Sequence, residues 1–142
     1  MGNLSDLIRG DLIMKTILFT AIIFMASTSF AENYKLDCQS QVDSFVVEIN
    51  SDNSYIHFVE KEDFDIAVDD YVYPAEMSKN LATVSAEIST YDYFFGTVSF
   101  YMGKGLKNVK TADSITIALD ADDGDGFGFD KRPYQCFVQK IK

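Results

Sequence analysis

The sequence predicts a small all-β protein, an antiparallel eight-stranded barrel whose first and last strands are joined by a disulfide. Three observations lead to this prediction. Apolar and polar residues alternate over short segments, which is the pattern of half-buried strands. Eight such segments follow one another at intervals of about ten residues, as in barrels and sandwiches. The two cysteines, Cys38 and Cys136, lie in the first and the last segment. A β-sandwich is the alternative architecture.

The first four strands are recognised by the apolar residues of one face, which are Tyr34, Leu36 and Cys38, then Phe45, Val47 and Ile49, then Ile56 and Phe58, then Phe64, Ile66 and Val68. The polar segment 51–54 is expected to be a turn, because Asp and Asn side chains bond their own backbone. Pro74 lacks an N–H group and is expected to end pairing of the fourth strand, which leaves 75–80 as a loop.

The last four strands are recognised in the same way, by Ala82, Val84, Ala86 and Ile88, by the aromatic run 91–102, by Ile115, Ile117 and Leu119, and by Tyr134, Cys136 and Val138. Gly96 lies in the middle of the aromatic run, where it predicts a bulge or a sharp bend. The segment 103–110 is expected to be a flexible basic loop.

The chain is expected to begin with a segment that is removed. Met14 and Lys15 are followed by an apolar run over 17–26 and then by small residues that end at Ala31. A positive charge, a short apolar core and a small-residue cleavage site are the features of a signal peptide. The interpretation divides the chain into a non-native upstream start, a signal peptide and a single all-β domain, at residues 1–13, 14–31 and 32–142. The mature domain is predicted to be periplasmic or secreted, without a transmembrane segment.

Two cysteines in an exported chain are expected to form one disulfide. The Cys38–Cys136 bond would close a loop of nearly the whole domain and restrict the unfolded chain accordingly. Such a loop corresponds to about 4–5 kcal/mol of stabilisation in the chain-entropy model.

The formal net charge of −10 restricts the class of partner. The charge persists after removal of the leader, because two acids and two bases leave with it. A strongly acidic domain is poorly suited to nucleic acid, whose phosphates require clustered Lys and Arg, and weakly suited to an anionic membrane. It would be steered toward a basic protein, a basic peptide or a cation. The alternative is that the charge only keeps an exported protein soluble.

An acidic, glycine-rich stretch over 120–130 is the candidate metal site. Calcium takes six to eight oxygen ligands, and alternating Asp residues in such a loop can converge on one ion. The candidate ligands are Asp120, Asp122, Asp123, Asp125 and Asp130. The spacing departs from that of the calcium loops it resembles, since Arg132 falls where a bidentate Glu belongs. The alternative is a wide acidic hairpin turn.

A second candidate surface combines acids with tyrosines, which are enriched at the centres of interfaces. The candidate partner-binding residues are Asp65, Asp69, Asp70, Tyr71 and Tyr73 from the segment 60–76, with Tyr91 and Tyr93 from the sixth strand. The alternative is that the segment is a solvated strand face, and that the sixth strand contributes only to the core.

No catalytic constellation is found in the sequence. His57 is the single histidine, both cysteines are expected to be paired, and no serine-nucleophile signature occurs. One histidine and two paired cysteines cannot form a zinc site. The expected function is therefore that of a non-catalytic binding domain without a cofactor other than calcium. A calcium-stabilised envelope protein and a small enzyme are the alternatives.

The stretch Tyr134-Gln135-Cys136 resembles a strand of the small disulfide-bonded periplasmic inhibitors of c-type lysozyme, and Leu36-Asp37-Cys38 is similar more loosely. That family combines a signal peptide, an eight-stranded barrel and acidic charge directed against a basic enzyme. The resemblance implies inhibitor-like binding to a basic protein. It concerns the outline of the domain and assigns no functional residue, because the Ser-Gly-x-x-Tyr loop of the family is not found here.

Overall fold

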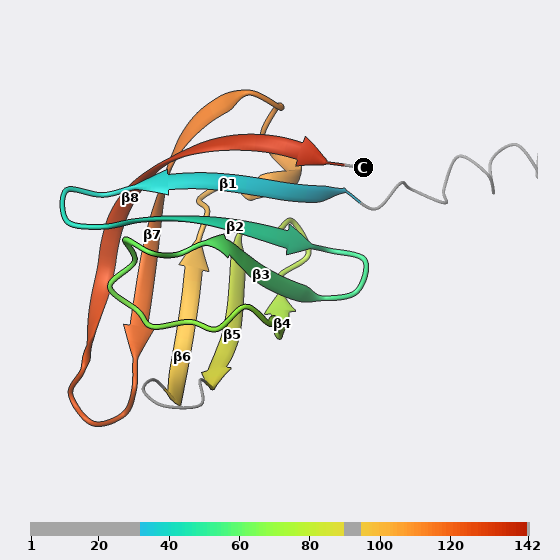
Figure 1. Cartoon of the computed structure of the whole chain (residues 1–142). Coiled ribbons are helices and arrows are strands. Elements are labelled where there is room, and N and C mark those ends of the chain that lie inside the picture. Colours follow the sequence, from blue (N-terminus) through green and yellow to red (C-terminus); the bar gives the residue numbers. More distant parts are fainter. Residues whose placement is uncertain (1–31, 90–94, 142) are drawn as a thin grey trace, which may run out of the picture. The chain divides into compact units, whose positions relative to one another are not determined.

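The computed structural model describes residues 32–89 and 95–141, which belong to one compact unit. Eight antiparallel strands close into a barrel in sequence order, and β8 pairs with β1 (Figure 1). The elements are β1 Asn33–Gln39, β2 Ser44–Asn50, β3 Tyr55–Glu60, β4 Val72–Met77, β5 Thr83–Ser89, β6 Phe95–Tyr101, the short 3-10 helix η1 Leu106–Asn108, β7 Asp113–Asp122 and β8 Gly128–Ile141. The predicted barrel is confirmed. The expected upstream start and signal peptide lie outside the described residues and stay predictions.

The disulfide joins the strands that close the barrel. Cys38 of β1 and Cys136 of β8 are directly opposite each other in the ladder, with their Cα atoms 4.0 Å apart. Both are fully buried, and 98 residues separate them in sequence. The predicted bond between the first and the last strand is confirmed.

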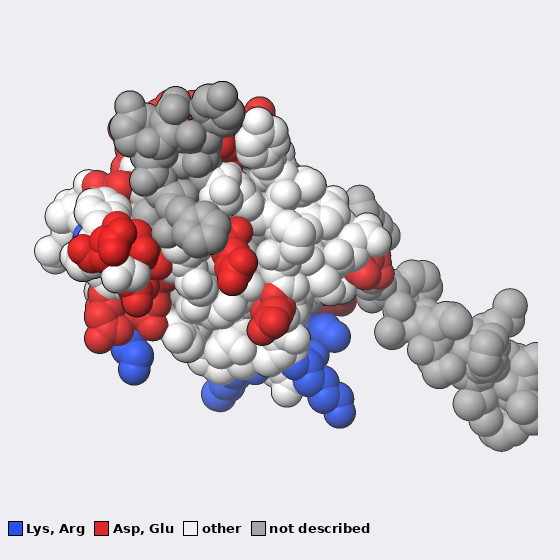
Figure 2. Space-filling model, turned by 90° about the horizontal axis from the view of Figure 1, so that it is seen from below, with Lys and Arg blue, Asp and Glu red and all other residues white. Residues whose placement is uncertain are grey.

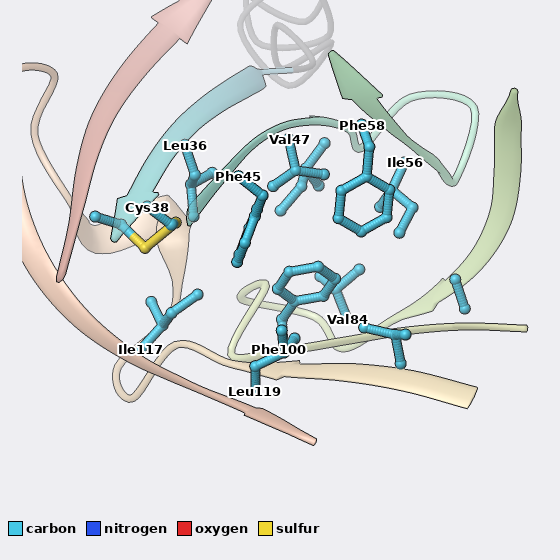
Figure 3. Close-up of a cluster of buried hydrophobic side chains, with 14 of the residues drawn as sticks. Leu36, Cys38, Phe45, Val47, Ile56, Phe58, Val84, Phe100, Ile117 and Leu119 are labelled. Carbon is cyan, nitrogen blue, oxygen red and sulfur yellow. A yellow bond between two sulfur atoms is a disulfide. The ribbon is translucent and has the colours of Figure 1, made fainter. Parts of the chain in front are cut away.

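Side chains from the inner faces of the strands fill the barrel (Figure 3). Aromatic rings occupy its centre, where the ring centroids of Phe45 and Phe58 are 5.8 Å apart and those of Phe45 and Tyr134 are 5.0 Å apart. Phe100 reaches the same cluster from β6, 6.2 Å from Phe58. These contacts are within the range of favourable aromatic pairs. The alternating pattern in the sequence therefore identified the core faces correctly.

The fourth strand was predicted in the wrong place. Residues 61–71, here called the strap, form an irregular segment, and the strand β4 comes after it. The strap nevertheless buries Phe64, Ile66 and Val68 in the core, with their neighbours exposed or half-buried. Two backbone N–H groups of the strap donate to side chains instead of to a neighbouring strand. The amide of Asp65 donates to a carboxylate oxygen of Asp43, and that of Asp69 donates to the Tyr73 hydroxyl.

Pro74 lies inside β4, contrary to prediction, and the expected loop 75–80 begins as strand. The first half of β4 pairs with β3 and the second half with β5, where the ladder starts at Ala75. The Ala75 amide donates to Ser54 O on the β3 side, so the N–H that Pro74 lacks would point toward β5. The proline therefore limits the β4–β5 ladder without ending the strand.

Two smaller expectations also need correction. The β5–β6 register is continuous through Gly96, and the register shifts lie at Val46/Val47 and Leu119/Ala121 instead. The basic loop is more ordered than expected, since it contains η1 with Leu106 fully buried. In the described part of the chain, no helix has the length and apolar character needed to cross a membrane.

Candidate functional site

The strand order places the connections alternately at the two ends of the barrel, because each strand runs antiparallel to the next. The connections 40–43, 61–71 and 123–127 share one end. The connections 51–54, 78–82 and 102–112 share the other end. The first end is called the acidic end and the second the lysine end, after the charged residues that dominate their connections.

Charges are sorted between the two ends. The described connections of the acidic end carry eight acidic residues and a single lysine, whereas those of the lysine end carry four lysines and a single aspartate. Figure 2, which views the molecule from below, shows the densest acidic cluster at the left of the view, further acidic groups elsewhere on this face, and basic groups along its lower edge. The net charge of −10 is thus far from evenly distributed, and a charged partner would meet two different surfaces.

Exposed apolar side chains gather at the acidic end. Among the described residues, six large hydrophobic side chains are exposed, and four of them lie there. They are Val42, Tyr71, Val72 and Phe127, with exposed fractions of 68%, 61%, 56% and 54%. Single exposed apolar residues are common on protein surfaces, but a concentration of them indicates an interaction site. The acidic end therefore combines negative charge with apolar contact area.

A buried carboxylate that the sequence did not reveal fixes this end. Asp43, 5% exposed, accepts hydrogen bonds from the Tyr134 hydroxyl at 2.9 Å, from Arg132 Nη1 at 3.1 Å and from the Asp65 amide at 3.2 Å. The Ser40 hydroxyl donates to its second oxygen at 2.5 Å. Burial and the bond to Asp43 together raise the pKa of Tyr134 well above its usual range. A buried charge with this many donors is stabilised in place.

Arg132 extends the network to the strap. Its Nη1 atom also lies 2.7 Å from Asp65 Oδ2, and its guanidinium carbon lies 3.7 Å from the centroid of the Phe129 ring. Burial lowers the pKa of Arg132, but the bonds to Asp65 and Tyr134 outweigh it and raise that pKa overall. The strap, the β1–β2 turn and β8 are thereby joined at one point. Asp65, predicted to bind a partner, is engaged in this internal ion pair.

The other end of the strap is joined to β3. His57 Nε2 lies 2.8 Å from Asp70 Oδ1, and this hydrogen bond, with a contribution from Lys61, lowers the pKa of Asp70. The amide of Asp69 is bonded to the Tyr73 hydroxyl. Asp69 and Asp70, two of the residues predicted to bind a partner, therefore also hold the strap in position.

The predicted tyrosines fall into different environments. Tyr71 is exposed at the acidic end, where it is available to a partner. Tyr73 is 5% exposed and lies in the core rather than on the surface. Tyr91 and Tyr93 lie outside the described residues, so their predicted role stays a prediction.

The predicted metal loop forms a hairpin turn in which carboxylates bond to the backbone. Asp122 Oδ1 accepts the Gly124 amide at 2.8 Å, and Asp123 Oδ1 accepts the amides of Asp125 and Phe127 at 2.8 and 3.0 Å. Within the ranges 32–89 and 95–141, no group of three or more Asp, Glu, His or Cys side chains is arranged to hold a metal ion. Calcium binding stays a prediction, which a calcium-dependent melting temperature would establish.

The hairpin also borders an acidic and aromatic depression of about 390 Å³. Its lining includes Asp120, Asp122, Phe127, Phe129 and Asp130. Desolvation raises the pKa of Asp120, but hydrogen bonds from the Lys131 amide and from Tyr101 outweigh it, so the pKa is lowered overall. That carboxylate is therefore ionised near neutral pH. Carboxylates beside aromatic rings are suited to a lysine or arginine side chain, which gains both an ion pair and a cation–π contact.

Fold and surface define an eight-stranded antiparallel barrel, closed by a disulfide, with one acidic and partly apolar end. No family model, curated protein or solved structure matches the chain.

Proposed function

We propose that the protein is an exported, non-catalytic binding domain that recognises a cationic protein through its acidic end. The observation that carries the proposal is the coincidence of acidic charge and exposed apolar side chains on the same three connections and on the adjoining first residue of β4. Charge alone would favour any cation, and apolar area alone would favour any hydrophobic surface. Together they favour a partner surface that carries Lys or Arg beside apolar groups.

The side-chain bonds that hold the strap in place support the proposal. Arg132, Asp43 and Asp65 hold the strap against β8, and His57 holds it through Asp70. A surface that is ordered before binding loses less conformational entropy when a partner arrives. The negative field would accelerate encounter, and the apolar groups would supply affinity that salt does not screen.

The test is the binding of the oxidised domain 32–142 to a set of immobilised basic proteins at increasing salt. A c-type lysozyme belongs in the set because of the resemblance noted from sequence, with cytochrome c and polylysine as cationic controls. We expect retention on at least one protein that persists where polylysine no longer binds. Purely electrostatic attraction is screened over about 10 Å at 0.1 M salt.

Matched variants locate the binding surface. Asp125→Lys at the acidic end and Asp52→Lys at the lysine end change the charge by the same amount on exposed turns. We expect Asp125→Lys to weaken binding by about tenfold or more and Asp52→Lys to have little effect. Tyr71→Ala should weaken the salt-resistant part of the binding. Equal effects of the two lysine variants, or release of every ligand together with polylysine, would contradict the proposal.

A further inference from the structure

We propose that the lysine end of the barrel docks on an anionic phospholipid surface, with the acidic end directed away from it. This second surface is independent of the partner proposed for the acidic end. The net charge of the chain argues against such docking only if its charges are treated as evenly mixed. The structure separates them, so each end has to be considered by itself.

The lysine end is built on two connections that are bonded to each other. The Leu106 amide donates to Leu81 O at 3.2 Å, and the Lys107 amide donates to Asn80 O at 3.3 Å. Gly105 permits this approach, since a Cβ atom added there would lie 2.1 Å from Asn80 O. Leu81 and Leu106 are buried beneath the contact. The backbone that carries the lysines is therefore fixed rather than a flexible loop.

Four lysines project from this scaffold, and all are exposed. They are Lys79, Lys104, Lys107 and Lys110. Within the described residues, the ion pairs of the molecule involve none of these four side chains. A cluster of four or more basic residues on one surface attracts anionic lipid headgroups.

Two acids beside the lysine end are engaged in contacts of their own. Glu32 lies 3.6 Å from the ammonium group of Lys140 and accepts a hydrogen bond from the Tyr34 hydroxyl. The carboxylate of Asp113 accepts the Lys110 amide at 3.1 Å. Asp52 is the single acid in the three connections of this end. Counted over its three connections, the lysine end therefore carries a net charge of +3, which is the source of an attractive field.

The acidic end is too distant to cancel that field. Strands of seven residues, such as β1 and β5, separate the two ends. At about 3.3 Å per residue and a tilt of about 40°, this corresponds to roughly 17 Å along the barrel axis. The Debye length is about 8 Å at physiological ionic strength, so repulsion between the acidic end and an anionic surface is strongly screened. Lysines that touch the surface are not screened in this way.

A flat surface fits this arrangement better than a linear polyanion. The lysines belong to turns at the rim of a barrel, and the depressions described on the molecule are lined by other residues. A polymer such as RNA or an acidic polysaccharide is bound more strongly where a basic groove follows its backbone. A membrane needs only a basic rim that all headgroups can approach together.

The experiment is co-sedimentation of the oxidised domain 32–142, a closed barrel, with large vesicles. One vesicle contains phosphatidylcholine only, and the other contains roughly one-third phosphatidylglycerol. The test variant is Lys104→Gln/Lys107→Gln, and the matched control is Lys61→Gln/Lys131→Gln, which removes the lysine of the acidic end and one from the first residues of β8. Heparin in solution tests whether any polyanion suffices. Circular dichroism and melting temperature verify that each variant is folded.

We expect binding to the anionic vesicles, none to neutral vesicles, and loss of binding at high salt. Each lysine contributes about a fivefold gain in partitioning, so the test variant should bind about 30-fold more weakly and the control should be unchanged. Three results would overturn the proposal. They are no binding to anionic vesicles at low salt, equal binding by test and control variants, and tighter binding to free heparin than to vesicles.

Discussion

At the residue scale, Asp43 shows how a single buried carboxylate organises the acidic end. Among the described residues it is the only charged side chain that is buried. Its donors come from β8, from the strap and from its own turn, and Arg132 lies 89 residues away in the sequence. A buried charge persists only where such partners compensate for its lost hydration. The network therefore stabilises the arrangement of three chain segments at once.

Replacement of Asp43 tests this role. Asp43→Ala would leave the Tyr134 hydroxyl and the Asp65 amide without their acceptor, so we expect the free energy of unfolding to fall by about 3 kcal/mol. The control is Asp63→Ala, an exposed aspartate in the same region, which should change it by less than about 0.5 kcal/mol. Urea unfolding measures both. Similar small losses in the two variants would show that the network adds little to stability.

Two buried tyrosines predict sensitivity to alkaline pH. Burial and hydrogen bonds to Glu32 and Asp43 raise the pKa values of Tyr34 and Tyr134, respectively, above that of an unfolded tyrosine near 10. Their contribution is complete below about pH 10. It is lost as the pH rises toward the folded-state values, because the unfolded chain releases these protons first.

The slope of stability against pH provides the measurement. Each such tyrosine contributes a loss of about 1.4 kcal/mol per pH unit in this window. Tyr134→Phe should remove one contribution, so the slope above pH 10 should become shallower by about that amount, although the variant is less stable at neutral pH. An unchanged slope would show that Tyr134 titrates normally in the folded protein.

At the element scale, the alternation of apolar and polar residues predicted which side chains face the core better than it predicted where strands form. Phe64, Ile66 and Val68 alternate like a strand and do face the core, yet the strap has no ladder there. The reason is that its amides bond to Asp43 and Tyr73 side chains, and no local pattern reports such distant acceptors. For Pro74 the error was the opposite one, since pairing was expected to end at a residue where the strand continues. β4 changes partners at this residue, so the missing N–H lies at the end of the β4–β5 ladder.

The candidate site was predictable only in part. Tyr71 and the acids of the strap were recognisable by composition, and they do lie at the acidic end. The sorting of charge between the ends required the strand order as well, since it depends on which connections lie together. The Asp43–Arg132 pair was not recognisable, because one acid before a strand and one arginine before a Tyr-x-Cys stretch carry no signal of their contact.

A pair of glycines tests the scaffold of the lysine end. Both Gly103 and Gly105 have positive φ, but an added Cβ meets open space at Gly103 and the backbone of Asn80 at Gly105. We expect Gly103→Ala to cost about 1–2 kcal/mol, which lowers the melting temperature by several degrees. Gly105→Ala should lower it considerably more, because the contact between the two connections must open. Equal losses would mean that the close approach to Asn80 is unimportant.

At the scale of the whole molecule, one covalent bond and one closed ladder define the fold. The Cys38–Cys136 bond spans 98 residues across the β1–β8 seam. Its removal in Cys38→Ala/Cys136→Ala should lower the free energy of unfolding by about 4–5 kcal/mol, chiefly because the unfolded chain gains freedom. Guanidinium unfolding of the variant and of the oxidised protein measures the difference. A loss below about 1 kcal/mol would show that the hydrogen-bonded seam is sufficient.

The separation of charge and apolar surface is the property of the whole molecule that matters for function. The most direct test is a map of backbone amide chemical shifts of the oxidised domain during titration with the basic protein that it retains most strongly. The proposed function predicts that changes concentrate at the acidic end, around Val42, Tyr71, Val72 and Phe127, and leave the connections 78–82 and 102–112 unaffected. Changes centred on the lysine end or on the outer wall of the barrel would contradict it.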